Sequence, residues 1–449
     1  MGETRAGGLA TDLYEIRMAA SYLRRGMVDR ATFSLFARKL PPDRGFLVAA
    51  GLADVLDLLT GFGFAPDELD YLRAEAGVSE SDVAALAGLR FDGDVWAVPE
   101  GTVVFGNEPL LEVTAPLPVA QLVETVVLNQ VTYATAVASK AARCVLAAGD
   151  ARVVDFGARR THGLEAAGTV ARVSAMVGVT GTSYVEGARR FGLRPVGTMA
   201  HSYVQAFPSE REAFAAFAED YPADTVFLVD TYDTLAGVAR AIEITREFGL
   251  APATVGVRLD SGNLPILATR ARRRLDEAGM ADAVIVASGG LDEFAIADLV
   301  TAAAPIDVYG VGTKMGVSWD APSLDSAYKL VEYAGRPVMK LSVGKATYPG
   351  AKQVFRGASG VPDLLGLRDE TAPSGRRPLL VPVLTDGVRT GNPALTPSET
   401  FEHDRAWLPA AARRVRAPEP LMAGPTPALR RLTDTVSAGL TPAPARACR

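Results

Sequence analysis

Short apolar segments that end in polar residues or glycine recur through the middle of the chain. They lie between residues 151 and 316 and read ARVVDFGARR, RPVGTMAH, DTVFLVDTYD, TVGVRLDSGN, AVIVASGGLD and IDVYGVGTKMG. Continuous apolar runs are typical of strands buried on both faces of a parallel sheet. Helical patterns at 161–177, 232–249 and 264–279 alternate with them, which implies right-handed β-α crossovers. The pattern predicts an irregular α/β barrel with six clear strands and a candidate seventh near residue 180.

The sections before and after the barrel contain both helical spacing and strand alternation. Before the barrel, helical spacing covers 12–26, 52–63 and 119–149, alternation predicts a strand at 31–41, and turn residues divide 94–116 into a small β meander. After it, 328–344 reads as a hairpin with its turn near Gly335. A docked helix is expected at 401–416, followed by a loose tail.

A chain of 449 residues is long enough for two or three domains. The expected divisions are 1–124 for an N-terminal α+β section, 125–330 for the catalytic barrel, 331–400 for a β-rich segment, and 401–449 for the C-terminal helix and tail.

Composition excludes several classes of protein. A net charge of -6 argues against general affinity for nucleic acid or an anionic membrane surface. No apolar run approaches the roughly 18 residues that a spanning helix needs, and the first residues lack a signal-peptide pattern. The two cysteines, Cys144 and Cys448, exclude a disulfide scaffold and a CxxC zinc site. A cytoplasmic enzyme is expected.

The segment YGVGTKMG follows the last apolar run of the barrel region. Closely spaced glycines let backbone N–H groups face an anion, and a threonine hydroxyl can add a further donor. Phosphate sites in barrels commonly follow the later strands. Gly310, Val311, Gly312 and Thr313 are therefore candidates for phosphate binding, with a tight turn that binds nothing as the alternative.

Two adjacent arginines, Arg159 and Arg160, follow the first barrel strand in DFGARRTHG. Guanidinium groups bind carboxylates and phosphates through paired N–H donors. Cations are unfavourable at a helix N-terminus, so two of them at this position indicate a bound anion rather than a helix start alone. A pair of surface arginines is the alternative.

Carboxylates and a histidine end other strands of the same set. Asp230, Asp233 and Asp260 could hold Mg²⁺ together with substrate phosphates, although each could instead cap a helix. His162 and His201 belong to the strand-end set, whereas His403 does not. A shared rim with carboxylates and arginines makes His201 a candidate catalytic residue.

Together these motifs resemble the nicotinate phosphoribosyltransferase family, the ATP-coupled enzymes of NAD salvage. The resemblance rests on segments in order along the chain: TDLYEIRMA (11–19), DFGARRTHG (155–163), GTSYVEGARRFGLRPVGTMAHSYV (181–204), VDTYDT (229–234), GVRLDSGN (256–263), YGVGTKM (309–315) and KLSVGKATYPGAKQVFR (340–356). It implies a type II phosphoribosyltransferase with an irregular α/β barrel and a second α+β domain, formed from the N-terminal section and the segment after the barrel that returns to it. Such an enzyme transfers phosphoribosyl from phosphoribosyl pyrophosphate to nicotinate. It also implies Mg²⁺ as cofactor, ATP as co-substrate, and a homodimer whose active sites are shared between subunits.

The resemblance also implies roles for individual residues. Tyr14, with Asp12 close by, would stack on the pyridine ring from the neighbouring subunit, and Phe156 would cover the other face. The remaining implied substrate contacts are Arg159, Arg160, Ser183, Arg258 and Ser288, with Gly310 to Thr313 holding the 5′-phosphate and Lys329, Lys340 and Lys345 as further phosphate contacts. The implied catalytic residues are His201, phosphorylated by ATP, and Asp230 and Asp260, which would also bind Mg²⁺.

Two positions bear on whether the chain is an active enzyme and on which base it would use. Gly289 stands where relatives often carry an aspartate, which leaves open a catalytically impaired, nucleotide-binding barrel. Ser183 stands where binding of a neutral amide would favour an aspartate, and serine there favours nicotinate over nicotinamide. Nicotinamide and quinolinate phosphoribosyltransferases of the same fold are the closer alternatives.

Overall fold

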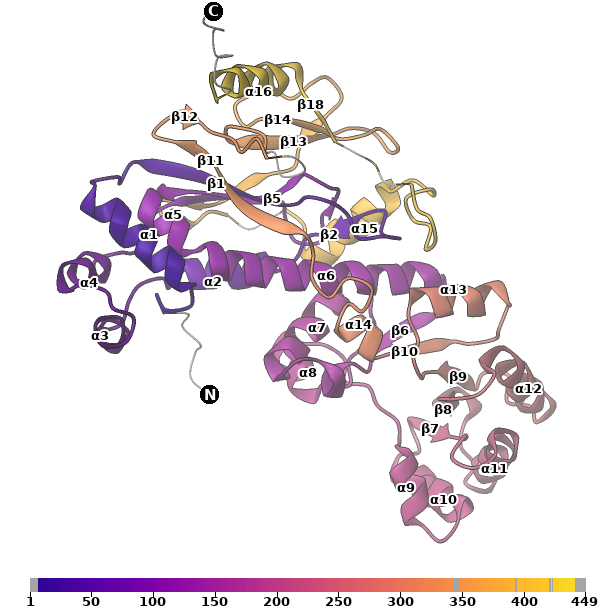
Figure 1. Ribbon diagram of the computed structural model, residues 1–449. Helices are drawn as coiled ribbons and strands as arrows, with labels where there is room; N and C mark the ends of the chain where they lie inside the picture. Colours follow the sequence, from indigo (N-terminus) through magenta and orange to yellow (C-terminus); the bar gives the residue numbers. More distant parts are fainter. Residues whose placement is uncertain (1–6, 343–346, 392–393, 420, 422, 441–449) are drawn as a thin grey trace, which may run out of the picture. The chain divides into compact units, whose positions relative to one another are not determined.

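The computed structural model describes residues 7–342, 347–391, 394–419, 421 and 423–440 (Figure 1). The chain forms two compact units. The flanking unit comprises Met1–Ala136 and Ser323–Arg449, and the barrel unit comprises Val137–Pro322. The boundary between them falls within the long helix α6 (Glu124–Ala148), which the helical spacing at 119–149 predicts.

A seven-stranded antiparallel sheet forms the centre of the flanking unit. Its order is β12 (Arg336–Pro337), β11 (Ser326–Tyr333), β1 (Arg30–Ala37), β5 (Pro109–Pro116), β3 (Asp94–Ala97), β16 (Val381–Thr385) and β17 (Val388–Arg389). Strand β1 lies between β11 and β5, and all its residues except the first are buried. The chain after the barrel unit therefore completes a sheet begun near the N-terminus, which confirms the predicted second α+β domain.

Helices and a short strand pair surround this sheet. The helices are α1 (Leu13–Arg24), α2 (Leu52–Thr60), α3 (Pro66–Ala74), α4 (Glu80–Ala87) and α5 (Leu117–Leu122), and the pair is β2 (Leu47–Val48) with β4 (Val103–Val104). Helix α1 packs against α5 and buries Ile16, Ala19 and Ala20, the apolar face that helical spacing predicts.

The C-terminal part of the chain is more ordered than its composition predicts. A second sheet has the order β15 (Arg377–Pro378), β13 (Lys352–Arg356), β14 (Leu364–Leu367) and β18 (Gly424–Pro425). Helix α15 (Pro397–Trp407) confirms a docked helix in this region, although it both starts and ends earlier than the predicted 401–416. Helix α16 (Pro427–Leu440) packs on β14 and β18, so the prediction of a loose tail was wrong for these residues. Pro427 is the first residue of this helix, a position where proline is favourable, and Leu429 is buried.

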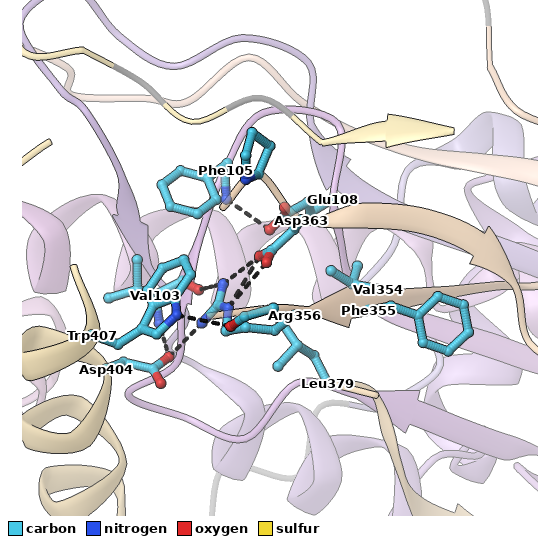
Figure 2. Close-up of polar contacts among 12 residues, drawn as sticks. Val103, Phe105, Glu108, Val354, Phe355, Arg356, Asp363, Leu379, Asp404 and Trp407 are labelled. Atoms are coloured by element: carbon cyan, nitrogen blue, oxygen red, sulfur yellow. Dashed lines mark hydrogen bonds and ion pairs between the residues drawn. The ribbon is translucent and has the colours of Figure 1, made fainter. Parts of the chain in front are cut away.

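A buried ion cluster joins distant segments of the flanking unit (Figure 2). Arg356, on β13, donates hydrogen bonds to Asp363 from Nε and Nη2 and to Asp404 from Nη1. Its guanidinium lies 4.3 Å from the Trp407 ring centroid. The side chains of Arg356, Asp363 and Asp404 are each no more than 1% exposed. Glu108 lies in the same cluster and accepts a hydrogen bond from the Phe105 N–H.

Burial, and next the charge of Asp363, raise the pKa of Glu108 to about 8. A carboxyl whose pKa is raised by folding stabilises the protein fully below its unfolded pKa, and this contribution is lost as pH rises through the folded pKa. We expect Glu108→Gln to match the wild type near pH 5. At pH 8 the variant should be more stable, the difference growing by up to about 1.4 kcal/mol per pH unit between the two pKa values.

Urea unfolding at several pH values measures this difference. Glu75→Gln, at an exposed position of the same unit, is the matched control and should leave the pH profile unchanged. Parallel profiles for Glu108→Gln and the wild type would show that Glu108 is ionised in the folded protein.

Five parallel strands form the sheet of the barrel unit. Their order is β6 (Arg152–Asp155), β10 (Val308–Val311), β9 (Val284–Ala287), β8 (Val255–Leu259) and β7 (Thr225–Leu228). Each corresponds to one of the apolar runs, and because all are parallel their carboxyl ends meet at one edge. The predicted irregular α/β barrel is confirmed.

The crossover helices of the barrel unit also follow the helical spacing. They are α7 (Leu164–Met176), α8 (Val185–Phe191), α9 (His201–Ala206), α10 (Glu210–Asp220), α11 (Thr234–Glu247), α12 (Leu264–Glu277), α13 (Glu293–Thr301) and the short α14 (Thr313–Gly316), with 3-10 turns η1 (Ala158–Arg160) and η2 (Pro252–Thr254). Helices α10, α11 and α12 pack side by side, as Figure 1 shows.

The sixth and seventh predicted strands do not form ladders. Both segments form isolated bridges instead: Thr182, near residue 180, bridges Asp155 on one side and Pro195, in RPVGTMAH, on the other. Proline lacks an N–H for a ladder, and Gly197 has no side chain to pack, so neither favours a regular strand here. The prediction that His201 ends a strand was therefore wrong: it begins helix α9.

Valine side chains line much of the interior of the barrel unit. Val154, Val286 and Val308 form a buried cluster, and Phe156 packs against it. A cavity of about 320 Å³ lies among these side chains. Phe156 thus marks the end of the apolar interior and the start of the polar rim. No helix in the described part of the chain is long and apolar enough to span a membrane.

Candidate active site

Asp155 holds together two loops at the end of β6. Its carboxylate accepts hydrogen bonds of 2.7 Å from the Thr182 hydroxyl and from the Gly157 N–H. Burial raises the pKa of Asp155, and these two hydrogen bonds oppose that rise. The Thr182 hydroxyl in turn accepts from the N–H of Tyr184. Asp155 therefore fixes the backbone on both sides of the rim, where Phe156 and Ser183 lie.

The ring of Phe156 lies between the first strand and the last. Its N–H donates to the Val311 carbonyl at 2.8 Å. A Cβ atom at Gly310 would lie 2.5 Å from the Phe156 ring, so glycine at this position is what lets the ring lie over β10. The guanidinium of Arg258 is 5.4 Å from the ring centroid, within the range of a cation–π contact.

Arg258, at the end of β8, organises the centre of the rim. It donates to the Ser288 hydroxyl at 2.8 Å, to the Thr198 hydroxyl at 3.0 Å and to Asp260 Oδ1 at 2.7 Å. Ser288 also donates to Asp260 Oδ1. Burial pushes the pKa of Asp260 upward, but the hydrogen bonds from Ser288 and Arg258 outweigh it and hold the pKa below its ordinary value. Asp260 is therefore a carboxylate at neutral pH.

Asp230 and Asp233 have different roles although they lie in one motif. Asp233 is the N-cap of α11 and accepts from the Ala236 N–H at 2.7 Å. Asp230 Oδ2 accepts from the Asp260 N–H and the Ser261 hydroxyl, whereas its Oδ1 is buried without a hydrogen-bond partner. The alternative of a helix cap is thus correct for Asp233, while Asp230 has an oxygen free for another ligand.

His201 lies beside the two segments that carry Asp230 and Asp260. Its Nδ1 is 3.1 Å from the Thr231 hydroxyl, and its Nε2 is 3.8 Å from Asp260 Oδ2. The imidazole side chain is 43% exposed, so a substrate can reach it. The structure therefore brings together His201, Asp230 and Asp260, as the shared-rim hypothesis requires.

The loop after β10 is joined to the loop after β9. Lys314, which follows Thr313, donates to Asp292 Oδ2 at 2.7 Å, and Asp292 also caps α13. At Gly289 the φ angle is +91°, and a Cβ atom would lie 2.1 Å from the Asp260 carbonyl oxygen. An aspartate could not replace Gly289 without moving this backbone, so the glycine fits the site rather than impairing it.

The paired arginines extend the rim beyond Phe156. Arg159 and Arg160 form the end of η1, and both side chains are exposed. Ser183 donates its backbone N–H to the Asp155 carbonyl at 2.8 Å, so it belongs to the same end of the sheet. Two exposed positive charges therefore follow Phe156 closely along the chain.

The other candidate residues belong to the flanking unit. Asp12 is the N-cap of α1 and donates its N–H to the Thr125 hydroxyl at 3.3 Å. Tyr14 is 48% exposed, and partial burial, followed by the charges of Glu124 and Glu15, raises its pKa. Lys329 lies 3.5 Å from Glu124, Lys340 is exposed, and Lys345 lies outside the described residues.

The comparisons with known proteins identify the family. The model of the nicotinate phosphoribosyltransferase N-terminal domain matches residues 9–132, and that of the nicotinate phosphoribosyltransferase family matches 151–353. The chain belongs to the nicotinate phosphoribosyltransferase family. A nicotinate phosphoribosyltransferase of Mycobacterium tuberculosis is 50% identical over 416 residues, 92% of this chain and 89% of that protein. One of Bacillus subtilis is 45% identical over 356 residues, covering 78% and 72%.

Solved structures of the family have the same fold. Human nicotinic acid phosphoribosyltransferase gives a TM-score of 0.83 at 28% identity, covering 95% of this chain and 99% of that one. Nicotinate-nucleotide pyrophosphorylase from Pyrococcus furiosus gives 0.73 at 26% identity, covering 89% and 94%. The family is thus shown by sequence along most of the chain and by structure.

A magnesium site is compatible with the rim. Among the described residues, no three His, Cys, Asp or Glu side chains are grouped so as to hold a metal ion by themselves. Asp230 and Asp260 are two carboxylates, and Mg²⁺ is commonly held by one or two carboxylates plus substrate phosphates. The buried Oδ1 of Asp230, which lacks a hydrogen-bond partner, suits such a cation.

Three residues at the rim received no role in the sequence analysis. Asp155 fixes the loops, Thr198 supports Arg258, and Thr231 contacts His201. Each is a short polar side chain at or near a strand end, a position where helix caps and turns are equally common. Only the position of Thr231 between Asp230 and Asp233 could have indicated its contact with a site residue.

Proposed function

We propose that this protein catalyses ATP-coupled, Mg²⁺-dependent transfer of phosphoribosyl from phosphoribosyl pyrophosphate to nicotinate, giving nicotinate mononucleotide and pyrophosphate in cytoplasmic NAD salvage. The observation that carries the proposal is the network in which Arg258 binds Ser288 and Asp260, next to the phenyl ring of Phe156. Family membership supports the same reaction.

The nicotinate ring would lie against Phe156. An aromatic face packs on the pyridine ring, and the guanidinium of Arg159 beside it would bind the carboxylate. Arg160 would add positive charge. Ser183 offers no negative charge near the ring, which suits an acid rather than a neutral amide.

The phosphoribosyl donor would occupy the rest of the rim. Backbone N–H groups of Gly310 to Thr313 would bind the 5′-phosphate, and the Arg258 network would lie near the ribose and pyrophosphate. Asp230 and Asp260 would hold Mg²⁺, which would neutralise the pyrophosphate charge when bound. These placements agree with the free oxygen of Asp230 and the lowered pKa of Asp260.

In the transfer step, the nicotinate ring nitrogen forms a bond to C1 of the ribose while the C1–O bond to pyrophosphate breaks. Positive charge develops on the sugar, and fixed carboxylates nearby stabilise it. Arg258 keeps Asp260 ionised for this purpose and holds it in place. The protein thus contributes orientation and electrostatics rather than a covalent intermediate in this step.

ATP coupling would use His201. A neutral imidazole is a competent nucleophile toward a phosphoryl group. The exposed side chain of His201 and its place beside Asp260 support phosphorylation at this residue. In a homodimer, Tyr14 and Asp12 would reach the ring site of a second copy of the chain. Lys329, Lys340 and Lys345 would be further phosphate contacts.

A product assay with nicotinate, nicotinamide and quinolinate tests the proposal. Because a charge-assisted contact from Arg159 would be lost with an amide, nicotinate should be preferred over nicotinamide by about 10- to 100-fold in kcat/KM. Arg159→Ala should narrow this preference. Arg189→Ala, which removes an exposed arginine paired with Glu186, is the matched control and should leave it unchanged.

The alternatives predict different outcomes. Equal or better turnover of nicotinamide would identify the amide as substrate, and turnover of quinolinate alone would identify the diacid. Binding of nucleotide without product from any of the three bases would indicate a catalytically impaired barrel.

A further inference from the structure

The two ring nitrogens of His201 have different surroundings. Nδ1 lies 3.1 Å from the hydroxyl oxygen of Thr231, a hydrogen-bond distance. Nε2 lies 3.8 Å from Asp260 Oδ2, which is too long for a hydrogen bond. Nδ1 is therefore engaged by the Thr231 hydroxyl, whereas Nε2 makes no hydrogen bond to Asp260.

The two oxygens of Asp260 differ in the same way. Oδ1 accepts from Arg258 and Ser288, which hold the carboxylate in place. Oδ2 faces His201 Nε2. A group added to Nε2 would thus lie on the side of the ring that faces Asp260 Oδ2. A group added to Nδ1 would have to displace the Thr231 hydroxyl.

We propose that Thr231 is a positioning residue that selects Nε2 of His201 as the phosphorylated nitrogen, an inference that rests on the proposed ATP coupling. In an imidazole carrying one proton, only the nitrogen without hydrogen has a lone pair for attack. When Nδ1–H donates to the Thr231 hydroxyl, the lone pair lies on Nε2. In that tautomer the hydroxyl accepts from Nδ1–H, keeps Nδ1 occupied and holds the orientation of the ring.

The phosphorylation step balances without a further reactant. The Nε2 lone pair forms the bond to the γ-phosphorus of ATP, and the bond from that phosphorus to the bridging oxygen breaks. ADP leaves with the bonding electrons. The proton on Nδ1 stays in place and keeps its hydrogen bond to Thr231 as the ring becomes positively charged, which strengthens that bond.

Threonine suits this role better than other hydroxyl residues. Its β-branched side chain has few rotamers, so the hydroxyl stays directed at the ring. Thr231 directly follows Asp230, shortly after the end of β7, and its side chain is half-buried. Valine has nearly the same shape without the hydroxyl, and serine keeps the hydroxyl without the methyl group. The two substitutions separate hydrogen bonding from packing.

The experiment measures acid-labile ³²P incorporation from γ-labelled ATP and assigns the phosphorylated nitrogen by ³¹P–¹H NMR. The wild type should carry the label on Nε2. Thr231→Val should be labelled about three- to tenfold more slowly, the effect of one lost hydrogen bond, with part of the label on Nδ1. Thr231→Ser should regain most of the rate and the Nε2 assignment. Thermal unfolding verifies that each variant is folded.

The outcomes distinguish this inference from the proposed function. Label on Nδ1 in the wild type, or equal labelling rates and positions in wild type and Thr231→Val, would overturn the role of Thr231 while leaving ATP coupling intact. A wild type that acquires no more label than His201→Asn would overturn both.

Discussion

Replacing Asp230 by asparagine is expected to lower kcat by about 10²- to 10³-fold, the usual effect of removing one charged group that acts in the transition state. Asp230 is held by the Asp260 N–H and the Ser261 hydroxyl through Oδ2, and its buried Oδ1 has no partner. An amide keeps the size of the side chain but removes its negative charge. The Mg²⁺ concentration that gives half-maximal activity should rise as well, because one proposed ligand is weakened.

Asp233→Asn is the matched control for this prediction. Asp233 lies in the same VDTYD motif but is exposed and caps α11, a role that asparagine fulfils equally well. We expect kcat and the Mg²⁺ dependence of this variant to match the wild type. Initial rates of nicotinate mononucleotide formation over a Mg²⁺ titration give both quantities. Equal losses in the two variants would indicate that the motif matters for structure alone.

The sequence predicts the edge of the sheet better than it predicts the individual roles of the residues there. Apolar runs that stop at polar residues locate β6 to β10, because a strand buried on both faces must be apolar until it leaves the sheet. Parallel pairing then brings Asp155, Asp260 and Ser288 to one edge without further information. The prediction of a strand failed for the segment 194–200, which forms a single bridge and no ladder.

Roles remain ambiguous where one residue type serves two purposes. Aspartate after a strand can cap the next helix or bind a cation, and local sequence does not separate Asp230 from Asp233. The distinction comes from Ser261 and the backbone of Asp260, which are remote in sequence and occupy only one oxygen of Asp230. The contact of Thr231 with His201 likewise depends on tertiary structure. The roles of Tyr14 and the lysines stay predictions.

Substituting methionine for Arg356 is expected to destabilise the flanking unit by about 3–5 kcal/mol, the cost of leaving buried charges without a partner. Arg356 is the cation that directly binds both Asp363 and Asp404, and it also donates to the Val103 carbonyl (Figure 2). Because methionine fills a similar volume, the decrease in the free energy of unfolding would come from the lost charge rather than from a cavity. The free energy of unfolding in urea, or the midpoint where unfolding is not two-state, measures the change.

Arg377→Met tests whether removal of any arginine near Asp404 has this effect. Arg377 lies 3.5 Å from the same carboxylate, but its side chain is 52% exposed, and such pairs contribute about 0–1 kcal/mol. Arg356→Met leaves the buried carboxylates of Asp363 and Asp404 without their counterion. The double variant Arg356→Met, Asp363→Asn should recover part of the lost stability, because it removes one of these two buried charges. A loss of equal size in Arg377→Met, or no recovery in the double variant, would place the stability of this unit in packing around Trp407 rather than in charge.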